Sequence, residues 1–177
     1  MPQNIEIKAR VPESDFESVR QIASELSDTD PEILVQVDTF FSVPNERLKL
    51  REFADGSAEL IAYSRSDQSA AKLSSYIRTP VSDPDALKRS LIQTVGLRGV
   101  VKKRRELFLV GPTRIHLDEV DGLGKFIELE VVLADDGSRE DGVKIADHLS
   151  EKLGIARGWL VSCAYIDLLL GNDVLSS

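Results

Sequence analysis

Charged and apolar residues alternate one by one along several segments of the chain, and this alternation constrains the fold more than any other feature. In residues 4–10 the charged side chains of Glu6, Lys8 and Arg10 alternate with apolar ones. Successive side chains of a β-strand point to opposite faces, so residues two apart share a face. The segment is therefore predicted to be a strand with one charged face and one apolar face.

The same division recurs in at least four further segments. Its charged members are Arg47, Lys49 and Arg51; Lys103 and Arg105; Arg114, His116 and Asp118; and Glu128 and Glu130. A solvated sheet face is the simplest explanation for any one strand. Such a face would also carry Thr, Ser, Gln and Asn, whereas these positions are nearly all ionisable. Acids and bases also fall largely on different strands, which indicates cations bound by the acids and an anion bound by the bases.

Turn signals recur at short intervals, which is typical of an antiparallel sheet. The predicted strands cover residues 4–10, 33–42, 46–53, 58–65, 72–79, 100–109, 113–120 and 125–133. Eight strands can close into a barrel whose charged faces line the lumen and whose apolar faces pack against helices outside. A lipid-carrying barrel would need an apolar lumen instead. We therefore predict an α+β fold, with an eight-stranded antiparallel barrel in one domain spanning residues 1–177.

Three or four helices are predicted around the strands. The first opens at Ser14, which forms a capping box with Glu17 and precedes an apolar face formed by Phe16, Val19, Ile22, Ala23 and Leu26. The second begins at Asp83 as N-cap with Pro84 at its first position, and ends before Gly96. A third covers about 139–153, and a short last one lies near 162–170. Trp159, Leu160 and the IDLLL stretch at 166–170 are expected to pack into the core, with a dimer contact as the alternative.

Composition excludes several functional classes. The net charge of −8 argues against a general nucleic-acid binder, which needs a basic surface. Neither a secretion signal nor an apolar run long enough to span a membrane is present, so a cytoplasmic protein is predicted. The single cysteine, Cys163, cannot form an internal disulfide. The acidic stretch near residues 135–141 is expected to be solvated, with a protein-docking surface as the alternative.

The acidic positions of the charged faces suit a hard divalent cation. Carboxylates are the ligands that Mg²⁺ or Mn²⁺ prefers, with phosphate oxygens and water completing the shell. The candidate ligands are Glu6, Asp118, Glu128 and Glu130. A zinc site is not expected, because the chain has two histidines and one cysteine in no zinc-binding spacing. His116 is expected to make a structural hydrogen bond, and His148 to be solvated.

Several motifs of the chain occur together in one known family. They are NIEIK at 4–8, QVDTFF at 36–41, RLKLRE at 47–52, Tyr63 with Arg65, Lys72-x-Ser74-x-Tyr76, VKKRRELF at 101–108 and RIHLDEVDGLGKFIELE at 114–130. The chain thereby resembles the CYTH superfamily of triphosphate tunnel metalloenzymes, and most closely the class IV adenylyl cyclases. The family's first motif is E-x-E-x-K, so this sequence departs from it at Asn4, where the first Glu is expected.

The resemblance implies a triphosphate lying in a basic lumen, with Mg²⁺ or Mn²⁺ on the carboxylates Glu6, Asp118, Glu128 and Glu130. It implies phosphate contacts from Lys8, Lys49, Arg51, Arg65, Lys72, Lys103 and Arg105, with Lys8 also as a catalytic residue. Arg can grip phosphate oxygens with two N–H groups, and Lys acts as a point charge. Neither a nucleic-acid nor a membrane partner is expected, and the resemblance leaves a homodimer open.

Two reactions and one non-catalytic role are consistent with such a site. Attack of the 3′-hydroxyl of ATP on its α-phosphorus would give cyclic AMP and pyrophosphate, and this adenylyl cyclase reaction is preferred. Attack of water on the terminal phosphorus would make the protein a triphosphatase for inorganic tripolyphosphate or an organic triphosphate such as thiamine triphosphate. Because Asn4 carries no charge, a protein that binds a nucleotide or polyphosphate without turnover is the third alternative.

Overall fold

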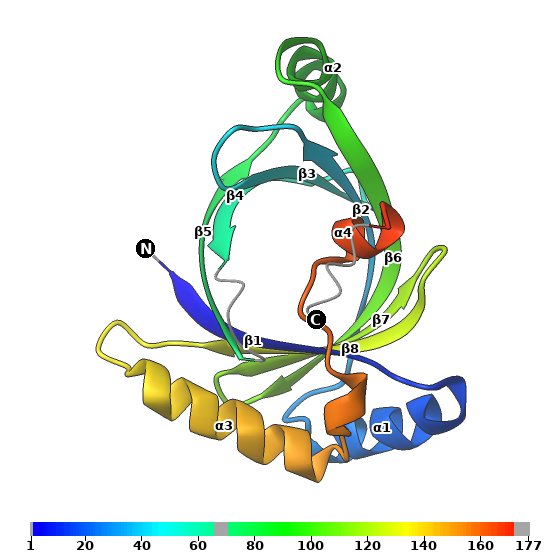
Figure 1. Cartoon of the computed structure of the whole chain (residues 1–177), viewed down its shortest axis with the longest axis vertical. Coiled ribbons are helices and arrows are strands. Elements are labelled where there is room, and N and C mark those ends of the chain that lie inside the picture. Colours follow the sequence, from blue (N-terminus) through cyan, green and yellow to red (C-terminus); the bar gives the residue numbers. More distant parts are fainter. Residues whose placement is uncertain (1, 66–70, 172–177) are drawn as a thin grey trace.

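Eight antiparallel strands close into a barrel in the computed structural model, which describes residues 2–65 and 71–171 (Figure 1). The strands are β1 (Gln3–Arg10), β2 (Glu32–Phe41), β3 (Arg47–Phe53), β4 (Ala58–Arg65), β5 (Lys72–Pro80), β6 (Leu97–Val110), β7 (Thr113–Val120) and β8 (Gly124–Val132). Around the barrel their order is β1-β5-β4-β3-β2-β6-β7-β8. The predicted fold class is therefore confirmed, and each predicted strand corresponds to an observed one.

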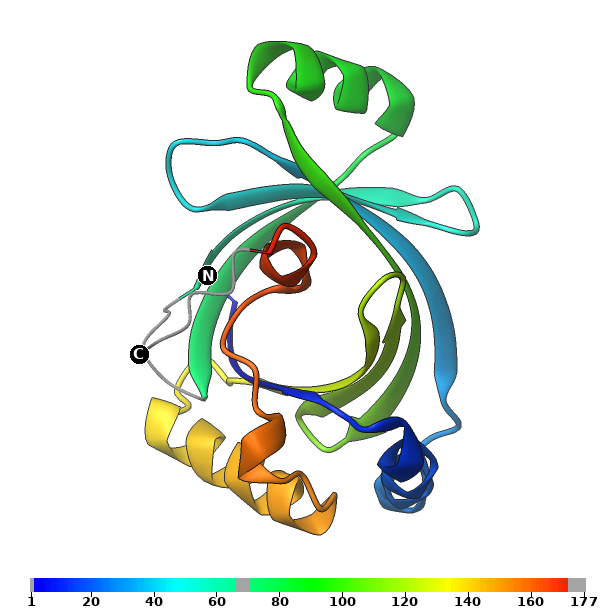
Figure 2. The same cartoon turned by 45° about the vertical axis from the view of Figure 1, so that its right-hand side comes forward.

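Helices α1 (Glu13–Leu26) and α3 (Arg139–Lys152) lie side by side under one wall of the barrel, whereas α2 (Pro84–Thr94) lies at the opposite end (Figures 1 and 2). The α3 helix packs against β1 and β8, α1 against β6, and α2 against β2 and β3. A 3-10 helix, η1 (Arg157–Trp159), leads to the short α4 (Tyr165–Leu169). Among the described residues, no helix is both long enough and apolar enough to cross a membrane.

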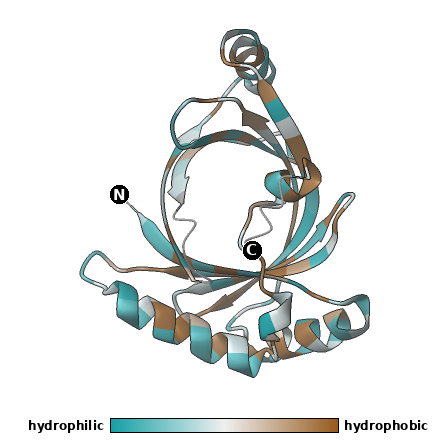
Figure 3. Cartoon of the chain, in the orientation of Figure 1, coloured by the Kyte–Doolittle hydropathy of each residue, from teal (hydrophilic) through white to brown (hydrophobic). Residues whose placement is uncertain are grey.

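The main hydrophobic core lies between the barrel wall and helices α1 and α3, outside the lumen. Its strand members alternate with the lumen-facing residues and are Ile5, Ile7, Ala9, Phe108, Ile115, Leu117, Ile127, Leu129 and Val131. Phe16, Val19 and Ala23 of α1 are buried against them, and Ile22 and Leu26 pack at the edge, as predicted. Figure 3 shows the resulting alternation of hydrophilic and hydrophobic residues along α3 and the strands. The apolar faces thus point outward to the helices, which leaves the charged faces inside.

Two helix boundaries differ from the predictions. The capping box at Ser14 is absent, because α1 begins at Glu13 and Ser14 lies inside its first turn, where its hydroxyl bonds Asp15. The last helix is shorter than predicted, since it begins at Tyr165 after an extended Ala164 and ends at Leu169. By contrast, Asp83 caps α2 as predicted by accepting from the Ala86 amide at 3.0 Å.

The C-terminal segment crosses from the α3 side of the barrel to its mouth. Val161 donates its amide to the carbonyl oxygen of Lys8 at 2.9 Å, so the segment runs beside β1. Asp167 of α4 then pairs with Arg98 of β6 at 2.6 Å and with Arg47 of β3 at 3.1 Å. These contacts hold α4 at the rim of the barrel, where Figure 2 shows it beside the opening. The prediction of core packing holds for Ile166, which is buried, but Leu160 is 37% exposed.

Gly142 provides a test of how tightly α3 packs on the barrel. Alanine favours a helix interior by about 1 kcal/mol over glycine. A Cβ at position 142, however, would come within 2.6 Å of Leu133 Cδ2 and 2.8 Å of Ile5 Cγ1. Overpacking of this kind costs about 1–3 kcal/mol, so Gly142→Ala is expected to lower the free energy of unfolding in urea. Gly158→Ala, where a Cβ would meet no atom within 4 Å, is the control. A Gly142→Ala protein more stable than the wild type would contradict the packing described.

Candidate functional site

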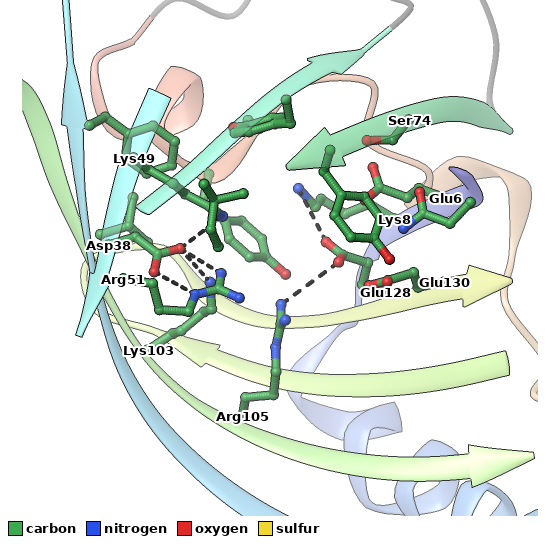
Figure 4. Close-up of a pocket in the computed structure, with 18 of the residues that line it drawn as sticks. Glu6, Lys8, Asp38, Lys49, Arg51, Ser74, Lys103, Arg105, Glu128 and Glu130 are labelled. Carbon is green, nitrogen blue, oxygen red and sulfur yellow. Dashed lines mark hydrogen bonds and ion pairs between the residues drawn. The ribbon is translucent and has the colours of Figure 1, made fainter. Parts of the chain in front are cut away.

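The lumen contains a cavity of about 760 Å³, counted with its open end, and its lining combines ionisable with aromatic residues. The ionisable and polar lining residues are Asn4, Glu6, Lys8, Asp38, Lys49, Arg51, Ser74, Arg78, Lys103, Arg105, Glu128 and Glu130. The remaining lining residues are Phe40, Ile61, Tyr63, Tyr76, Val101, Ala164 and Tyr165. We call this space the main cavity. Figure 4 shows its labelled side chains converging from strands on different sides of the barrel.

Asp38 of β2 is the centre of a basic cluster at one side of the main cavity (Figure 4). Arg51 holds it with two hydrogen bonds of 2.7 Å, and the ammonium groups of Lys49 and Lys103 each lie 3.1 Å from its Oδ2 atom. Burial would raise the pKa of Asp38, but Arg51, Lys103 and Lys49 hold it well below its usual value. One buried carboxylate thus faces three cationic side chains, and the cluster retains an excess of positive charge.

The pKa values of both lysines in this cluster are lowered, so their charged forms are disfavoured. Burial is the main cause that lowers the pKa of Lys49 to about 8, with a further contribution from the charge of Arg51, while Asp38 opposes both. The pKa of Lys103 is lowered well below its ordinary value for the same reason. A phosphate anion in the cavity would favour the charged forms of both lysines, because it adds the negative charge that the cluster lacks.

A second Arg–Asp pair lies deeper in the lumen. Arg105 holds Asp118 through two hydrogen bonds of 2.7 Å, and the Tyr165 hydroxyl donates to the same carboxylate at 2.7 Å. Asp118 is fully buried and does not line the main cavity. Its oxygens therefore orient Arg105 and Tyr165, and its role as a metal ligand stays a prediction.

The carboxylates of β1 and β8 form the acidic side of the site. Glu6 faces Glu130 in the β1–β8 register, and Glu128 faces Lys8. Glu128 lies 3.6 Å from the Lys8 ammonium and 3.7 Å from Arg105 Nη2 (Figure 4). Burial would raise the pKa of Glu128, but Lys8, His116 and Arg105 hold it well below its usual value, so it is a carboxylate at neutral pH.

The remaining predicted site residues fall into different places. Lys72 is buried and donates to the carbonyl oxygen of Ser162, and it is not part of the cavity lining. Arg65 is the last residue of β4, and its side chain lies outside the described part of the structure. Arg114 and His116 line a second cavity at the other end of the lumen, which shares Glu130 with the main cavity.

Sequence reasoning missed the parts played by Asp38, Arg78 and Tyr165. Asp38 had a detectable signal, because it shares a strand face with Phe40 within a motif of the resemblance, and its neighbours on both sides are basic strands. Tyr165 had none. It reaches the lumen because the C-terminal segment bends over the barrel mouth, and its ring then lies 4.0 Å from the Lys8 ammonium.

The comparisons with known proteins agree with this geometry. The model of the CYTH domain family matches residues 2–164, which include all eight strands and stop one residue before α4. Adenylate cyclase CyaB from Aeromonas hydrophila is 26% identical over 166 residues, covering 86% of this chain and 83% of that protein.

Two solved structures show the same architecture. The PH1012 protein from Pyrococcus horikoshii OT3 matches with a TM-score of 0.80 and 25% identity, covering 93% of this chain and 98% of the other. The Hippeastrum protein HpAC1, described as having a dominant triphosphatase activity, matches with a TM-score of 0.70 and covers 98% of both chains. At 16% identity, this second likeness establishes a shared fold alone.

Asp38→Asn tests the basic cluster directly. The change would leave Arg51, Lys49 and Lys103 without their buried carboxylate. Removal of one partner from a buried ion pair costs about 3–5 kcal/mol, so a loss of this size is expected in urea unfolding at pH 7. Asp136→Asn, at an exposed position, should change stability by less than about 0.5 kcal/mol. If the two variants lose stability equally, Asp38 does not hold the cluster.

Proposed function

Since the chain belongs to the CYTH domain family, we propose that it is a divalent-cation-dependent enzyme that acts on a triphosphate held in the barrel lumen. The observation that carries the proposal is that one cavity is lined on one side by a basic cluster with excess positive charge and on the other side by three carboxylates. A triphosphate carries several negative charges and is commonly bound together with Mg²⁺ or Mn²⁺. The two halves of the main cavity match these two components.

The basic half would hold the phosphates. We assign this role to Lys8, Lys49, Arg51, Lys103 and Arg105, all of which line the main cavity. Arg51 and Arg105 are oriented by Asp38 and Asp118, so little side-chain freedom remains to be lost when an anion binds. Phosphoryl transfer depends mainly on positioning and charge stabilisation, and fixed guanidinium groups supply both. Lys72 donates to the carbonyl oxygen of Ser162, so it would act indirectly by holding the C-terminal segment in place. Arg65 keeps its predicted role as a phosphate ligand.

The acidic half would hold the cation. Glu6, Glu128 and Glu130 line the cavity together, and their oxygen donors suit Mg²⁺ or Mn²⁺. When bound, the cation would neutralise charge on the phosphates and polarise the bond that breaks. Lys8 lies beside Glu128, and we propose that it stabilises charge on the reacting phosphate.

Among triphosphates, we propose ATP as the substrate and cyclic AMP with pyrophosphate as the products. Inorganic tripolyphosphate has no apolar part, yet one part of the cavity lining is aromatic, with Phe40, Tyr63, Tyr76 and Tyr165. Stacking of a base on an aromatic side chain is worth about 1–3 kcal/mol. The name of the Aeromonas relative, an adenylate cyclase, supports the same choice.

A triphosphatase is the second candidate. Water could reach a terminal phosphate through the second cavity, which meets the main one at Arg51, Arg78, Arg105 and Glu130. The activity described for the Hippeastrum protein keeps this candidate open for proteins of the fold. The two reactions differ in which phosphorus is attacked, and hence in how deeply the triphosphate enters the lumen.

Product analysis separates the candidates. The purified protein with Mg²⁺ or Mn²⁺ is expected to convert ATP to cyclic AMP and pyrophosphate, and to release less phosphate from tripolyphosphate or thiamine triphosphate. Glu128→Gln should lower the rate at least about 10-fold, because it removes charge from the cation site. Glu119→Gln, on the exposed face of the adjacent strand β7, is the matched control.

Other outcomes would identify the alternatives. Release of phosphate alone would establish the triphosphatase. Tight binding without any product would make the protein a triphosphate binder, and a gain in turnover from Asn4→Glu would then show that the missing carboxylate limits the reaction. Equal rates for wild type and Glu128→Gln would remove Glu128 from the site.

The lowered pKa of Lys49 predicts how the affinity for a triphosphate depends on pH. Its pKa of about 8 means that it is charged below pH 8 and neutral above it. In calorimetric titrations with tripolyphosphate, affinity is therefore expected to fall as pH rises through about 8. Lys49→Arg keeps its charge at every pH and should lessen this fall. Lys103 is present in both proteins, so the comparison of the two profiles reports mainly on position 49. Parallel profiles would exclude a phosphate contact by Lys49.

A further inference from the structure

His116 lies on the lumen face of β7, beside the acidic half of the site. It faces Glu128 in the register of β7 and β8, and Arg114 faces Glu130 two residues away. The imidazole is only 4% exposed, and its Nδ1 atom lies 3.4 Å from Glu128 Oε1. This separation is at the long limit for a hydrogen bond, so the contact holds the ring only weakly.

His116, Glu128 and Glu130 form a group whose potential ligand atoms all lie within 4.8 Å of one another. Across residues 2–65 and 71–171, no other trio of His, Cys, Asp and Glu side chains meets this condition. All three residues are at least nearly buried, and Glu130 contributes to both cavities of the lumen. The group therefore lies where the main cavity meets the second cavity, next to the space assigned to the triphosphate.

Asn4 gives an independent indication that this region binds a ligand. It is 2% exposed and lines the main cavity together with Glu6, Glu128 and Glu130. Its Oδ1 atom has no hydrogen-bond partner among the described residues. A buried acceptor without a partner is unfavourable, and a cation or a water bound to it would remove this cost. Because the amide is neutral, the acidic half also holds one carboxylate fewer than a Glu at this position would give it.

We propose that His116 supplies a nitrogen ligand to the divalent cation held by Glu128 and Glu130. The inference rests on the proposed metal dependence and adds a residue that the carboxylate pattern does not contain. An imidazole suits transition metals, whereas Mg²⁺ prefers oxygen ligands. The site would accordingly favour Mn²⁺ over Mg²⁺ more strongly than an all-carboxylate site, and the neutral ring would take a coordination position without adding charge.

Electron spin echo spectroscopy of the Mn²⁺-loaded protein tests this assignment without measuring activity. A directly bound imidazole nitrogen modulates the echo of Mn²⁺, whereas carboxylate and water oxygens do not. The chain has only two histidines, and His148 is exposed on α3, so the origin of a histidine signal can be assigned by mutation. The wild type and His148→Gln are expected to show the nitrogen modulation, and His116→Gln to lose it.

Calorimetry with each metal alone gives the accompanying affinity. His116→Gln is expected to weaken Mn²⁺ binding by at least about 10-fold, because even the loss of an outer-shell partner costs about 10- to 100-fold in metal affinity. Mg²⁺ binding is expected to change less. Bound Mn²⁺ without nitrogen modulation in the wild type, or modulation that survives His116→Gln, would overturn the inference and leave the proposed enzyme intact. Failure of the wild type to bind Mn²⁺ or Mg²⁺ at all would overturn both. The wild-type spectrum decides the question even if His116→Gln does not fold.

Discussion

The need to balance charge inside a closed barrel governs this structure. Moving an ion out of water costs several kcal/mol even in a relaxed protein interior, so charges that line a lumen must be paired or hydrated. The barrel meets this need with two bidentate pairs, Arg51 with Asp38 and Arg105 with Asp118. The pairing is incomplete around Asp38, where Lys49 and Lys103 share the same carboxylate. The residual positive charge is what makes the lumen suited to a polyanion.

The hydrophobic core supports the site from outside the lumen. Strands β1 and β8 carry the acidic half of the site on their inner faces, and together with β7 they bury their outer faces under α1 and α3 (Figure 1). Side chains on packed strands keep their positions better than side chains on loops, so the carboxylates have a rigid base. On the outer face of β2, α2 packs near Phe41, whereas Ile33 and Val35 are nearly half exposed among the described residues. The well-packed part of the barrel wall is thus the part that carries the carboxylates.

Strand alternation predicted the barrel well because it is a local property that tertiary contacts did not override. Glu6, Lys8, Lys49, Arg51, Lys103, Arg105, Glu128 and Glu130 all line the main cavity, as their shared faces indicated. What alternation could not predict was which charges pair with each other. Asp118 lies on the same strand face as Arg114, yet it accepts hydrogen bonds from Arg105 and Tyr165. Such pairing depends on the register between strands. The place of Tyr165 depends on a chain segment that crosses the barrel mouth, and no periodic pattern encodes that.

We propose that one lumen holds a triphosphate on its basic side and a cation on its acidic side. A crystal structure with a non-hydrolysable ATP analogue and Mn²⁺, with anomalous scattering to locate the metal, tests it most directly. We expect phosphate density between Arg51, Lys103 and Arg105, and an anomalous peak beside Glu128 and Glu130. Nucleotide or metal bound only on the outer surface of the barrel, with the Asp38 cluster unchanged, would contradict it.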